Sequence, residues 1–468
     1  MRTASRVARA AVVASALAIG LALPAGADDE PVPLRLSLAD AEERVLARSE
    51  EIRLAREQVT RSESQIAQVR AGAFPQVTGS MGYDRTIRSI FDLEVEPPPG
   101  APPNGIGDLF GDLPFGQSNT WSLGIQINQP LYTGGRVSTG LDIAERVRRT
   151  SRHGVSESES EIVRDVRQAY LQALYSDSLV EIAAQSHELA DEQVRLVESF
   201  EARGTASELD VLQARVERDN IEPQLVQAQN AARLAELQLK RLLNIAIARP
   251  LELTSGLPDD DLDVIIDRDE VVRAALRRPV VLSARERVRV QEESIELART
   301  GRRPTVSAFA NFSWQAFPDQ IIPTSLPGTS EWREDWIVGL QASIPIFDGF
   351  RAKGEIDEAR SQWRSSVLEE RQLRQGITME AEATITELEA SRAQIAARRS
   401  TVVEAERVFE LAELRYETGM ARLIELSNAR LLLQQARVNE VEARVNFLSS
   451  LAAVEYITGG ELGLFGER

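Results

Sequence analysis

Cysteine is absent from this chain of 468 residues, and histidine occurs only twice. Without cysteine the protein forms no disulfide and no thiolate metal site, and it lacks the residue at which a bacterial lipoprotein is cleaved. The sequence also contains no nucleophile elbow and no phosphate-binding loop. We therefore expect a protein that is not an enzyme and that holds no cofactor and no metal.

Basic residues are fewer than acidic ones in this chain. The chain has 54 Lys and Arg residues against 72 Asp and Glu residues. Three of the arginines fall in the first 27 residues, which contain no acid, so the remainder has 51 basic against 72 acidic residues and a net charge of about −21. Such a surface repels phosphates, and nucleic acid is therefore not an expected partner.

Long apolar runs are confined to the start of the chain. Ala10 to Leu23 is almost entirely apolar, follows three arginines and precedes Ala25-Gly26-Ala27, a pattern typical of a secretory signal peptide over residues 1–27. No later segment is long and apolar enough to cross a bilayer as a helix. Only a β-barrel is then left as a way through a membrane.

The sequence contains an internal duplication with a spacing of 215 residues. The stretch QPLYTGGR returns as IPIFDGFR, and its Pro130, Tyr132, Gly134 and Arg136 return as Pro345, Phe347, Gly349 and Arg351. Further along, RGTASELDVLQAR (203–215) returns as TGMARLIELSNAR (418–430). A repeat this long predicts two structural halves, 28–245 and 269–468, joined by a linker over 246–268.

Each half has the same predicted order of elements. A helix comes first (38–73 and 269–301), and strict alternation of apolar and polar residues then predicts two strands (75–94 and 119–131; 304–317 and 334–347). A long helix follows (135–201 and 350–416), with a glycine turn and a return helix (205–244 and 420–457). We expect a kink at Pro223 and no regular structure in the Pro/Gly-rich loop 97–116.

The four strands pose a physical problem because one face of each is apolar and the other polar. Four strands cannot close a barrel, and an open sheet in lipid leaves unpaired edges. Several copies must then share a barrel, of eight strands for two copies or twelve for three. Small eight-stranded barrels are filled by side chains, whereas polar inner faces suit a wet lumen, which favours three copies. The charged long helices, roughly 100 Å each at the usual rise, must project into water.

On these paired motifs the chain resembles the TolC-like outer membrane efflux proteins, also called outer membrane factors. The resemblance implies an α+β membrane protein, a homotrimer with a twelve-stranded transmembrane β-barrel in the outer membrane and a continuous α-helical, coiled-coil barrel in the periplasm. It implies the passive exit duct of a tripartite efflux or type I secretion system for drugs, toxic small molecules or secreted proteins. The implied partners are a periplasmic adaptor, an inner-membrane RND or ABC transporter, and outer membrane lipid.

A second hypothesis is a periplasmic coiled-coil scaffold that does not conduct. The alternating strands separate the two hypotheses, because a scaffold has no need of an apolar stripe that faces lipid.

The resemblance also implies that the glycine turns lie at the periplasmic end and close the pore. The implied gate acids lie six positions after each turn glycine, at Asp210 and Glu425. A further acid of the family is replaced here by Asn428, and Arg422 lies one position away from a family basic residue. Asp210 has an equal alternative as the capping partner of Ser207, whereas Glu425 has no Ser or Thr three residues before it.

Three further sets of candidate residues follow from the motifs. The turns are candidate adaptor-docking tips, or plain helix–helix turns: Gly204, Thr205, Ala206, Ser207, Gly419, Met420 and Ala421. The eight residues of the repeated QPLYTGGR motif given above mark the junctions between barrel and helix. Candidate interfacial aromatics, or alternatively residues that pack between strands, are Trp121, Trp314, Trp332 and Trp336.

Overall fold

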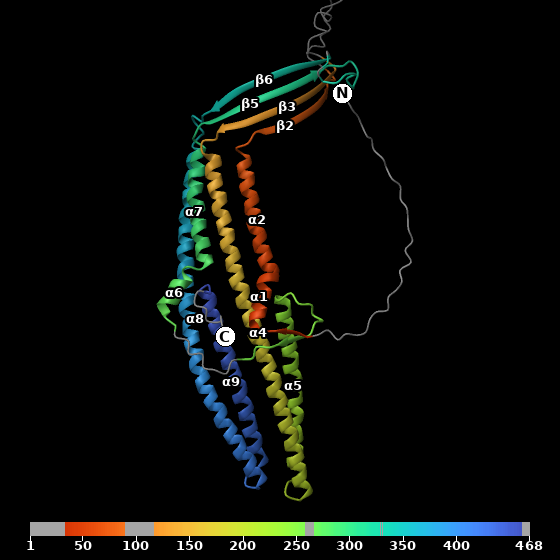
Figure 1. The fold of residues 1–468 in the computed structure, drawn as a ribbon, viewed down its shortest axis with the longest axis vertical. Coiled ribbons are helices and arrows are strands. Elements are labelled where there is room, and N and C mark those ends of the chain that lie inside the picture. The colour runs from red at the N-terminus through yellow and green to blue at the C-terminus, as the bar shows by residue number, and fades with distance from the viewer. Residues whose placement is uncertain (1–32, 89–116, 258–265, 328, 330, 461–468) are drawn as a thin grey trace, which may run out of the picture.

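The computed structural model describes residues 33–88, 117–257 and 266–460, apart from residues 328 and 330. The expected signal peptide (1–27) and the Pro/Gly-rich loop (97–116) lie outside the described residues. The described chain is elongated, with a β-sheet at one end, two helical hairpins at the other and a group of short elements between them (Figure 1). Within the described residues, no helix has the length and apolarity needed to cross a bilayer.

The larger sheet is antiparallel with the strand order β2-β3-β5-β6. Its strands are β2 Gln76–Arg85, β3 Asn119–Tyr132, β5 Thr305–Ala316 and β6 Trp332–Ser343. Each half of the chain contributes two neighbouring strands, and the pairing of β3 with β5 joins the two halves.

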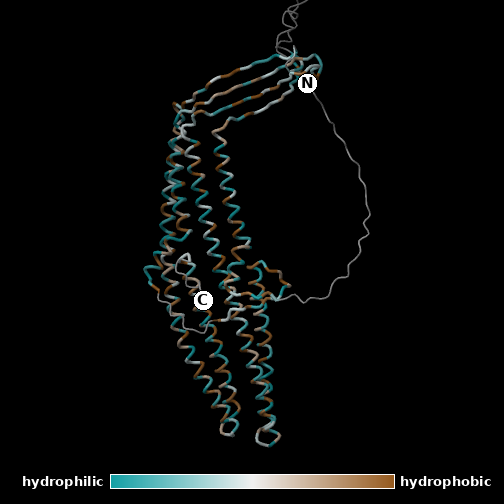
Figure 2. Tube along the Cα trace, viewed as in Figure 1, coloured by the Kyte–Doolittle hydropathy of each residue, from teal (hydrophilic) through white to brown (hydrophobic). Residues whose placement is uncertain are grey.

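The register of the sheet separates an apolar face from a polar one. Met81 lies opposite Leu123, and Leu123 lies opposite Trp314. One residue earlier along β2, Ser80 lies opposite Gly124, which in turn lies opposite Ser313. The alternation is visible along the strands in Figure 2. The apolar face is uncovered in this chain, since Met81 is 68% and Val338 75% exposed.

Two predicted strand boundaries are wrong. The strand expected over 75–94 ends at Arg85, because its partner β3 begins at Asn119, which pairs with Arg85; residues 89–94 of this prediction lie outside the described residues. The strand expected over 334–347 runs from Trp332 to Ser343. It ends before Pro345, which has no N–H with which to continue the ladder.

The first predicted helix of each half is in fact two helices. These are α1 Leu38–Arg48 with α2 Glu50–Ala71, and α6 Arg268–Ala275 with α7 Pro279–Thr300. At the first break, the Ser49 hydroxyl accepts hydrogen bonds from the N–H groups of Glu51 and Ile52 and starts a new helix. At the second break, Pro279 occupies the first position of α7, where its missing N–H costs nothing.

The long helices run from the sheet to the far end of the molecule (Figure 1). They are α4 Arg136–Ala202 and α8 Arg351–Glu417, and the return helices are α5 Glu208–Leu242 and α9 Leu423–Ile457. Each long helix has 67 residues, which corresponds to about 100 Å at 1.5 Å per residue. The return helix α5 continues through Pro223.

The expected linker contains an element that the sequence did not predict. Strand β4 Leu251–Leu253 lies within residues 246–268 and pairs in parallel with β1 Leu34–Leu36. This small sheet packs on α4, where the Tyr170 hydroxyl donates to the Leu36 carbonyl at 3.1 Å. Strand β1 is thereby attached to the segment between the two halves.

The two junction glycines give a matched test of backbone strain. Both Gly134 and Gly349 have a φ of +65°, where alanine costs roughly 1–2 kcal/mol. A Cβ at Gly134 also lies 2.9 Å from the Arg303 Cβ, whereas a Cβ at Gly349 meets open space. We predict that Gly134→Ala lowers the melting temperature in detergent more than Gly349→Ala does, as measured by helical circular dichroism. Equal melting temperatures would show that the contact with Arg303 is not tight.

Candidate functional site

Both helical hairpins turn at a glycine with positive φ. Gly204 has a φ of +76° and Gly419 a φ of +74°, a conformation that other residues rarely adopt. In the first turn the Phe200 carbonyl accepts from the Thr205 N–H at 2.9 Å. In the second, the Arg415 carbonyl accepts from the Met420 N–H at 2.8 Å. Geometry alone therefore explains both glycines, and their role in docking stays a prediction.

An aromatic pair connects the two hairpins just above their turns. The rings of Phe200 on α4 and Tyr416 on α8 have their centres 5.7 Å apart. They belong to a cluster that takes residues from all four helices, including Val197, Val211 and Leu426. Burial raises the pKa of the Tyr416 hydroxyl, and the nearby charge of Asp210 raises it further. The tips are thus held side by side within one chain.

A buried polar network lies next to this cluster. Arg430 on α9 donates to the Gln193 side chain on α4 at 3.0 Å and to the Glu217 carboxylate on α5 at 3.1 Å. The Ser427 hydroxyl donates to the same carboxylate at 2.8 Å and accepts from Gln193 at 3.1 Å. Burial lowers the pKa of Arg430, and the charge of Glu217 opposes this effect. The network connects three helices and both halves of the chain.

We did not predict this network from the sequence, although Arg430 lies in the repeated tip motif. Arg430 closes the repeated tip motif and corresponds to Arg215 in the first copy. Arg215 makes an exposed ion pair with Glu198 at 2.6 Å, whereas Arg430 is buried. A repeat marks both arginines alike, and only packing separates them.

Asp210 forms the capping box that the sequence offered as an alternative. Its N–H donates to the Ser207 hydroxyl at 3.3 Å, and its carboxylate accepts from the Ser207 N–H at 3.0 Å. The hydrogen bonds from the Ser207 hydroxyl and N–H lower the pKa of Asp210. Because folding lowers this pKa, the ionised Asp210 carboxylate stabilises the folded state. The contribution is complete at a pH above the ordinary pKa of 3.8, and it is lost as the pH falls through the pKa of the folded state.

Glu425 also caps its helix, which the sequence did not lead us to expect. Its carboxylate accepts from the Arg422 N–H at 3.4 Å and lies 3.8 Å from the Arg415 guanidinium. The absence of a Ser or Thr at position 422 therefore did not exclude capping, because the acid alone reaches the backbone. Arg422, Glu425 and Asn428 are all exposed at the tip.

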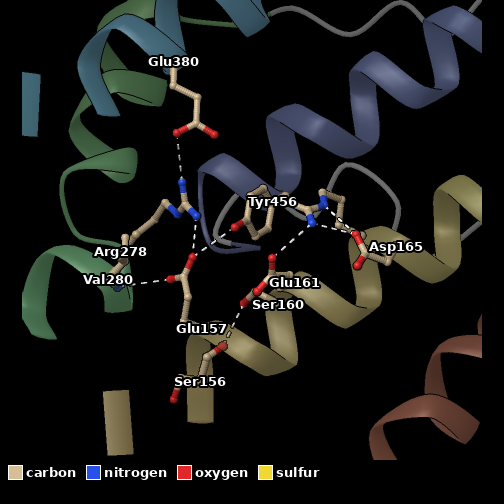
Figure 3. Close-up of polar contacts among 10 residues, drawn as sticks. Ser156, Glu157, Ser160, Glu161, Asp165, Arg278, Val280, Glu380 and Tyr456 are labelled. Atoms are coloured by element: carbon tan, nitrogen blue, oxygen red, sulfur yellow. Dashed lines mark hydrogen bonds and ion pairs between the residues drawn. The ribbon is translucent and has the colours of Figure 1, made fainter. Parts of the chain in front are cut away.

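A second polar cluster lies midway along the molecule, where α9 ends (Figure 3). Arg278 is buried, pairs with Glu157 on α4 and lies 3.7 Å from Glu380 on α8. The guanidinium groups of Arg278 and Arg164 each lie 4.3 Å from the centre of the Tyr456 ring. The Tyr456 hydroxyl donates to Glu157 at 3.1 Å. This cluster fixes the end of α9 against both long helices.

The candidate interfacial tryptophans differ in exposure. Trp332 is only 7% exposed and donates to the Ser325 carbonyl at 3.0 Å, so it packs under its own loop, which favours the packing alternative for this residue. Trp121 donates to the Ile321 carbonyl at 2.8 Å, and Trp314 to the Glu334 carboxylate at 3.3 Å. Trp336 is 62% exposed, and its place in an interfacial belt stays a prediction.

The repeated junction motif lies where the sheet meets the long helices. Gly134 and Gly349 take positive φ values, Pro130 lies next to an irregularity in the β3–β5 register, and Pro345 follows β6. Tyr132 ends β3, whereas Phe347 lies beyond the end of β6. Arg136 and Arg351 begin α4 and α8. Of the described residues, none form a group of three or more His, Cys, Asp or Glu placed to hold a metal.

Comparison with protein families gives one match that covers most of the chain. The family described as "Outer membrane efflux protein" matches residues 42–244 and 271–460, that is, both halves. Among individual proteins, the cobalt-zinc-cadmium resistance protein CzcC of Cupriavidus metallidurans is 23% identical, over 71% of this chain and 76% of its own length. The toluene efflux pump outer membrane protein TtgF of Pseudomonas putida is 25% identical, over 76% and 74%.

Solved structures share the fold at low identity. The outer membrane protein VceC of Vibrio cholerae is 18% identical and superposes with a TM-score of 0.71, covering 90% of this chain and 96% of VceC. The CmeC outer membrane channel of Campylobacter jejuni is 17% identical with a TM-score of 0.74, covering 90% and 85%.

The buried and exposed arginines of the tip repeat give a matched pair of variants. Breaking a fully buried ion pair lowers the free energy of unfolding by about 3–5 kcal/mol. Because the Glu217 side chain is 29% exposed, we expect Arg430→Ala to lower it by only roughly 2 kcal/mol. For Arg215→Ala we expect less than about 1 kcal/mol, because that pair is exposed. Hydrogen exchange should therefore speed up in the first turns of α9 only for Arg430→Ala. Equal protection in both variants would contradict a structural role for the network.

Proposed function

The chain belongs to the outer membrane efflux protein family, and from this premise we propose that three copies of it form one exit duct. Proteins of this family are non-enzymatic outer membrane channels of efflux systems, and this chain shares that function and location. The alternative hypothesis of a non-conducting scaffold is thereby excluded. The finer assignments concern the number of copies, the partners, the cargo and the gate.

The sheet supports assembly with other copies. Its apolar face is exposed, and β2 and β6 are the outermost strands of the described sheet. Joining β6 of one copy to β2 of the next satisfies both edges and continues the apolar face around a ring. Three copies give a barrel of twelve strands, wide enough for a polar lumen.

The return helix α5 supports the same conclusion. Leu209, Leu212 and Val216 lie on one stripe at the spacing of a coiled-coil seam, and all three are exposed in the single chain. On α8, Leu411 and Leu414 are likewise exposed. A neighbouring copy that packs its α8 against this α5 covers both stripes and closes the helices into a tube.

The proposed partners are a periplasmic adaptor, which meets the tips around Gly204 and Gly419, and an inner-membrane RND or ABC transporter. Two relatives are named for metal-ion resistance and for toluene efflux. These names favour small toxic solutes over secreted proteins as the cargo. The protein conducts passively, since the family does no chemistry.

The proposed gate combines acids at the tips with the contacts that hold the hairpins together. Asp210 and Glu425 lie in the first turns of α5 and α9, so three copies place six carboxylates near the narrow end. Such carboxylates attract cations and repel anions. The network of Gln193, Glu217 and Arg430 ties the two hairpins of each copy and so limits how far they separate.

Assembly is tested by a charge on the exposed stripe of α5. Leu212→Glu places a carboxylate in the proposed seam between copies, and we predict that the trimer is lost, whereas Leu212→Met preserves it. Native mass spectrometry of protein from the outer membrane fraction reads out the number of copies. A trimer of Leu212→Glu as stable as the parent would mean that this stripe is not an interface.

The gate is tested by separating charge from capping. Glu425→Gln and Asp210→Asn each remove three charges per trimer, and we predict about a twofold or larger fall in cation preference in single-channel recordings. Ser207→Ala weakens the cap but keeps every carboxylate, so its selectivity should stay unchanged. If Ser207→Ala and Asp210→Asn behave alike, Asp210 acts only as a cap.

A further inference from the structure

The segments at the boundary between the sheet and the helices are basic, although the chain as a whole is acidic. Four segments meet there and are called the collar below: residues 70–76, 130–137, 299–305 and 346–354. The collar contains seven basic residues (Arg70, Arg136, Arg299, Arg302, Arg303, Arg351 and Lys353) and one acid, Asp348. The chain as a whole carries a net charge of −18.

Most of the collar cations are not used within the chain. Arg70, Arg136, Arg302 and Lys353 are exposed, and no ion pair or side-chain hydrogen bond joins them to another described residue. Arg351 is also exposed and lies 4.0 Å from Glu355, a weak contact within one helix. These charges are therefore available to an external anion.

Exposed aromatic rings accompany the cations. Phe74 follows α2, Tyr132 ends β3, and Phe347 and Phe350 follow β6; all four are exposed. The rings of Phe347 and Phe350 meet edge to face with their centres 5.6 Å apart. They continue the exposed apolar stripe of β6, which includes Leu340.

Phe350 occupies a conformation that a phenylalanine does not favour. Its φ is +66°, and the first copy has Gly135 at the matching position with a φ of +90°. A side chain in this region costs roughly 1 kcal/mol or more, and Phe350 is 70% exposed, so no core packing offsets the cost. The ring is placed where another surface can cover it.

The distance along the sheet fits a bilayer between its two aromatic ends. Trp121 and Tyr132 are eleven residues apart on β3, which gives about 36 Å at 3.3 Å per residue and about 28 Å across a membrane at a tilt of about 40°. A hydrocarbon core is about 30 Å thick. The collar then lies at the level of the phosphates on the periplasmic side.

We propose that the collar binds anionic phospholipid headgroups at the periplasmic face of the outer membrane. Arg136, Arg302 and Arg351 hold the phosphates, and Phe347 and Phe350 insert beside the acyl chains. The charge complementarity and the continuity with the apolar stripe of β6 both favour lipid over a second copy of the chain. The proposal rests on the proposed assembly, because a closed ring turns the collar into a belt.

The test compares lipid retention by two sets of variants. The trimer is released from vesicles that contain phosphatidylglycerol and phosphatidylethanolamine in equal amounts, and bound lipids are counted by native mass spectrometry. We expect the parent to retain phosphatidylglycerol preferentially. In R136Q/R302Q/R351Q the ratio of bound phosphatidylglycerol to bound phosphatidylethanolamine should fall by roughly fivefold for each arginine removed. The control R195Q/R233Q/R398Q removes exposed arginines of α4, α5 and α8 away from the collar and should behave like the parent.

Each other outcome overturns the proposal. Equal lipid preference in the parent and the collar variant shows that the collar does not select lipid. A change in pore ion selectivity with unchanged lipid retention shows that these arginines face the lumen instead. Ion conduction in the same vesicles reports on the proposed duct separately, so a failure of assembly is recognised as such. If the triple variant does not assemble, R302Q and R351Q are compared singly.

The position of the aromatic pair is measured independently of charge. Because the chain has no cysteine, Phe350→Cys provides a single site for a nitroxide label. Its accessibility to oxygen and to a water-soluble nickel complex should place it at headgroup depth in vesicles, and the matched Gly135→Cys gives a reference on the first copy. A label at Phe350→Cys that is shielded from both reagents shows that a neighbouring copy covers the site, and the lipid proposal is then wrong.

Discussion

A sheet that is apolar on one face and open at two edges cannot be stable by itself in either water or lipid, and the rest of this molecule depends on that constraint. The pairing of β3 with β5 places the two copies of the repeat next to each other in one sheet. The long helices α4 and α8 follow β3 and β6, and β5 lies between these two strands. Helix α7 packs against both long helices near the sheet, and α9 packs against both further towards the tips. The edges that remain, β2 and β6, point to further copies of the chain.

The helical part distributes its polar contacts unevenly along its length. In the middle, Arg278 and Tyr456 are joined to both long helices, and Arg167 pairs with Glu42 and Glu455. At the tip, a smaller network around Arg430 lies beside exposed acids. A buried ion pair is costly to break when its partner is left without water, so the middle of the molecule is the stiffer part. The hairpin tips are held together by the smaller of the two networks.

The two copies of the repeat share their backbone conformation at the turns and junctions, but they differ in the side chains placed there. Both copies turn at a glycine and cap the return helix with an acid, but Ser207 completes the cap only in the first copy. Gly135 in one junction is Phe350 in the other, with the same sign of φ. In the proposed ring of three copies, each type of junction and each type of tip occurs three times.

The sequence by itself determined the duplication, the two-faced strands, the long helices and the glycine turns, because these follow from local periodicity and backbone preference. It also determined the family, through motifs repeated in the same order. Only the tertiary structure decided that Arg430 is buried while Arg215 is exposed, that Trp332 packs under a loop, that β4 pairs with β1 inside the expected linker, and that Glu425 caps its helix. Spacing along a chain specifies which face a side chain occupies, but burial and ion pairing depend on which other element covers that face.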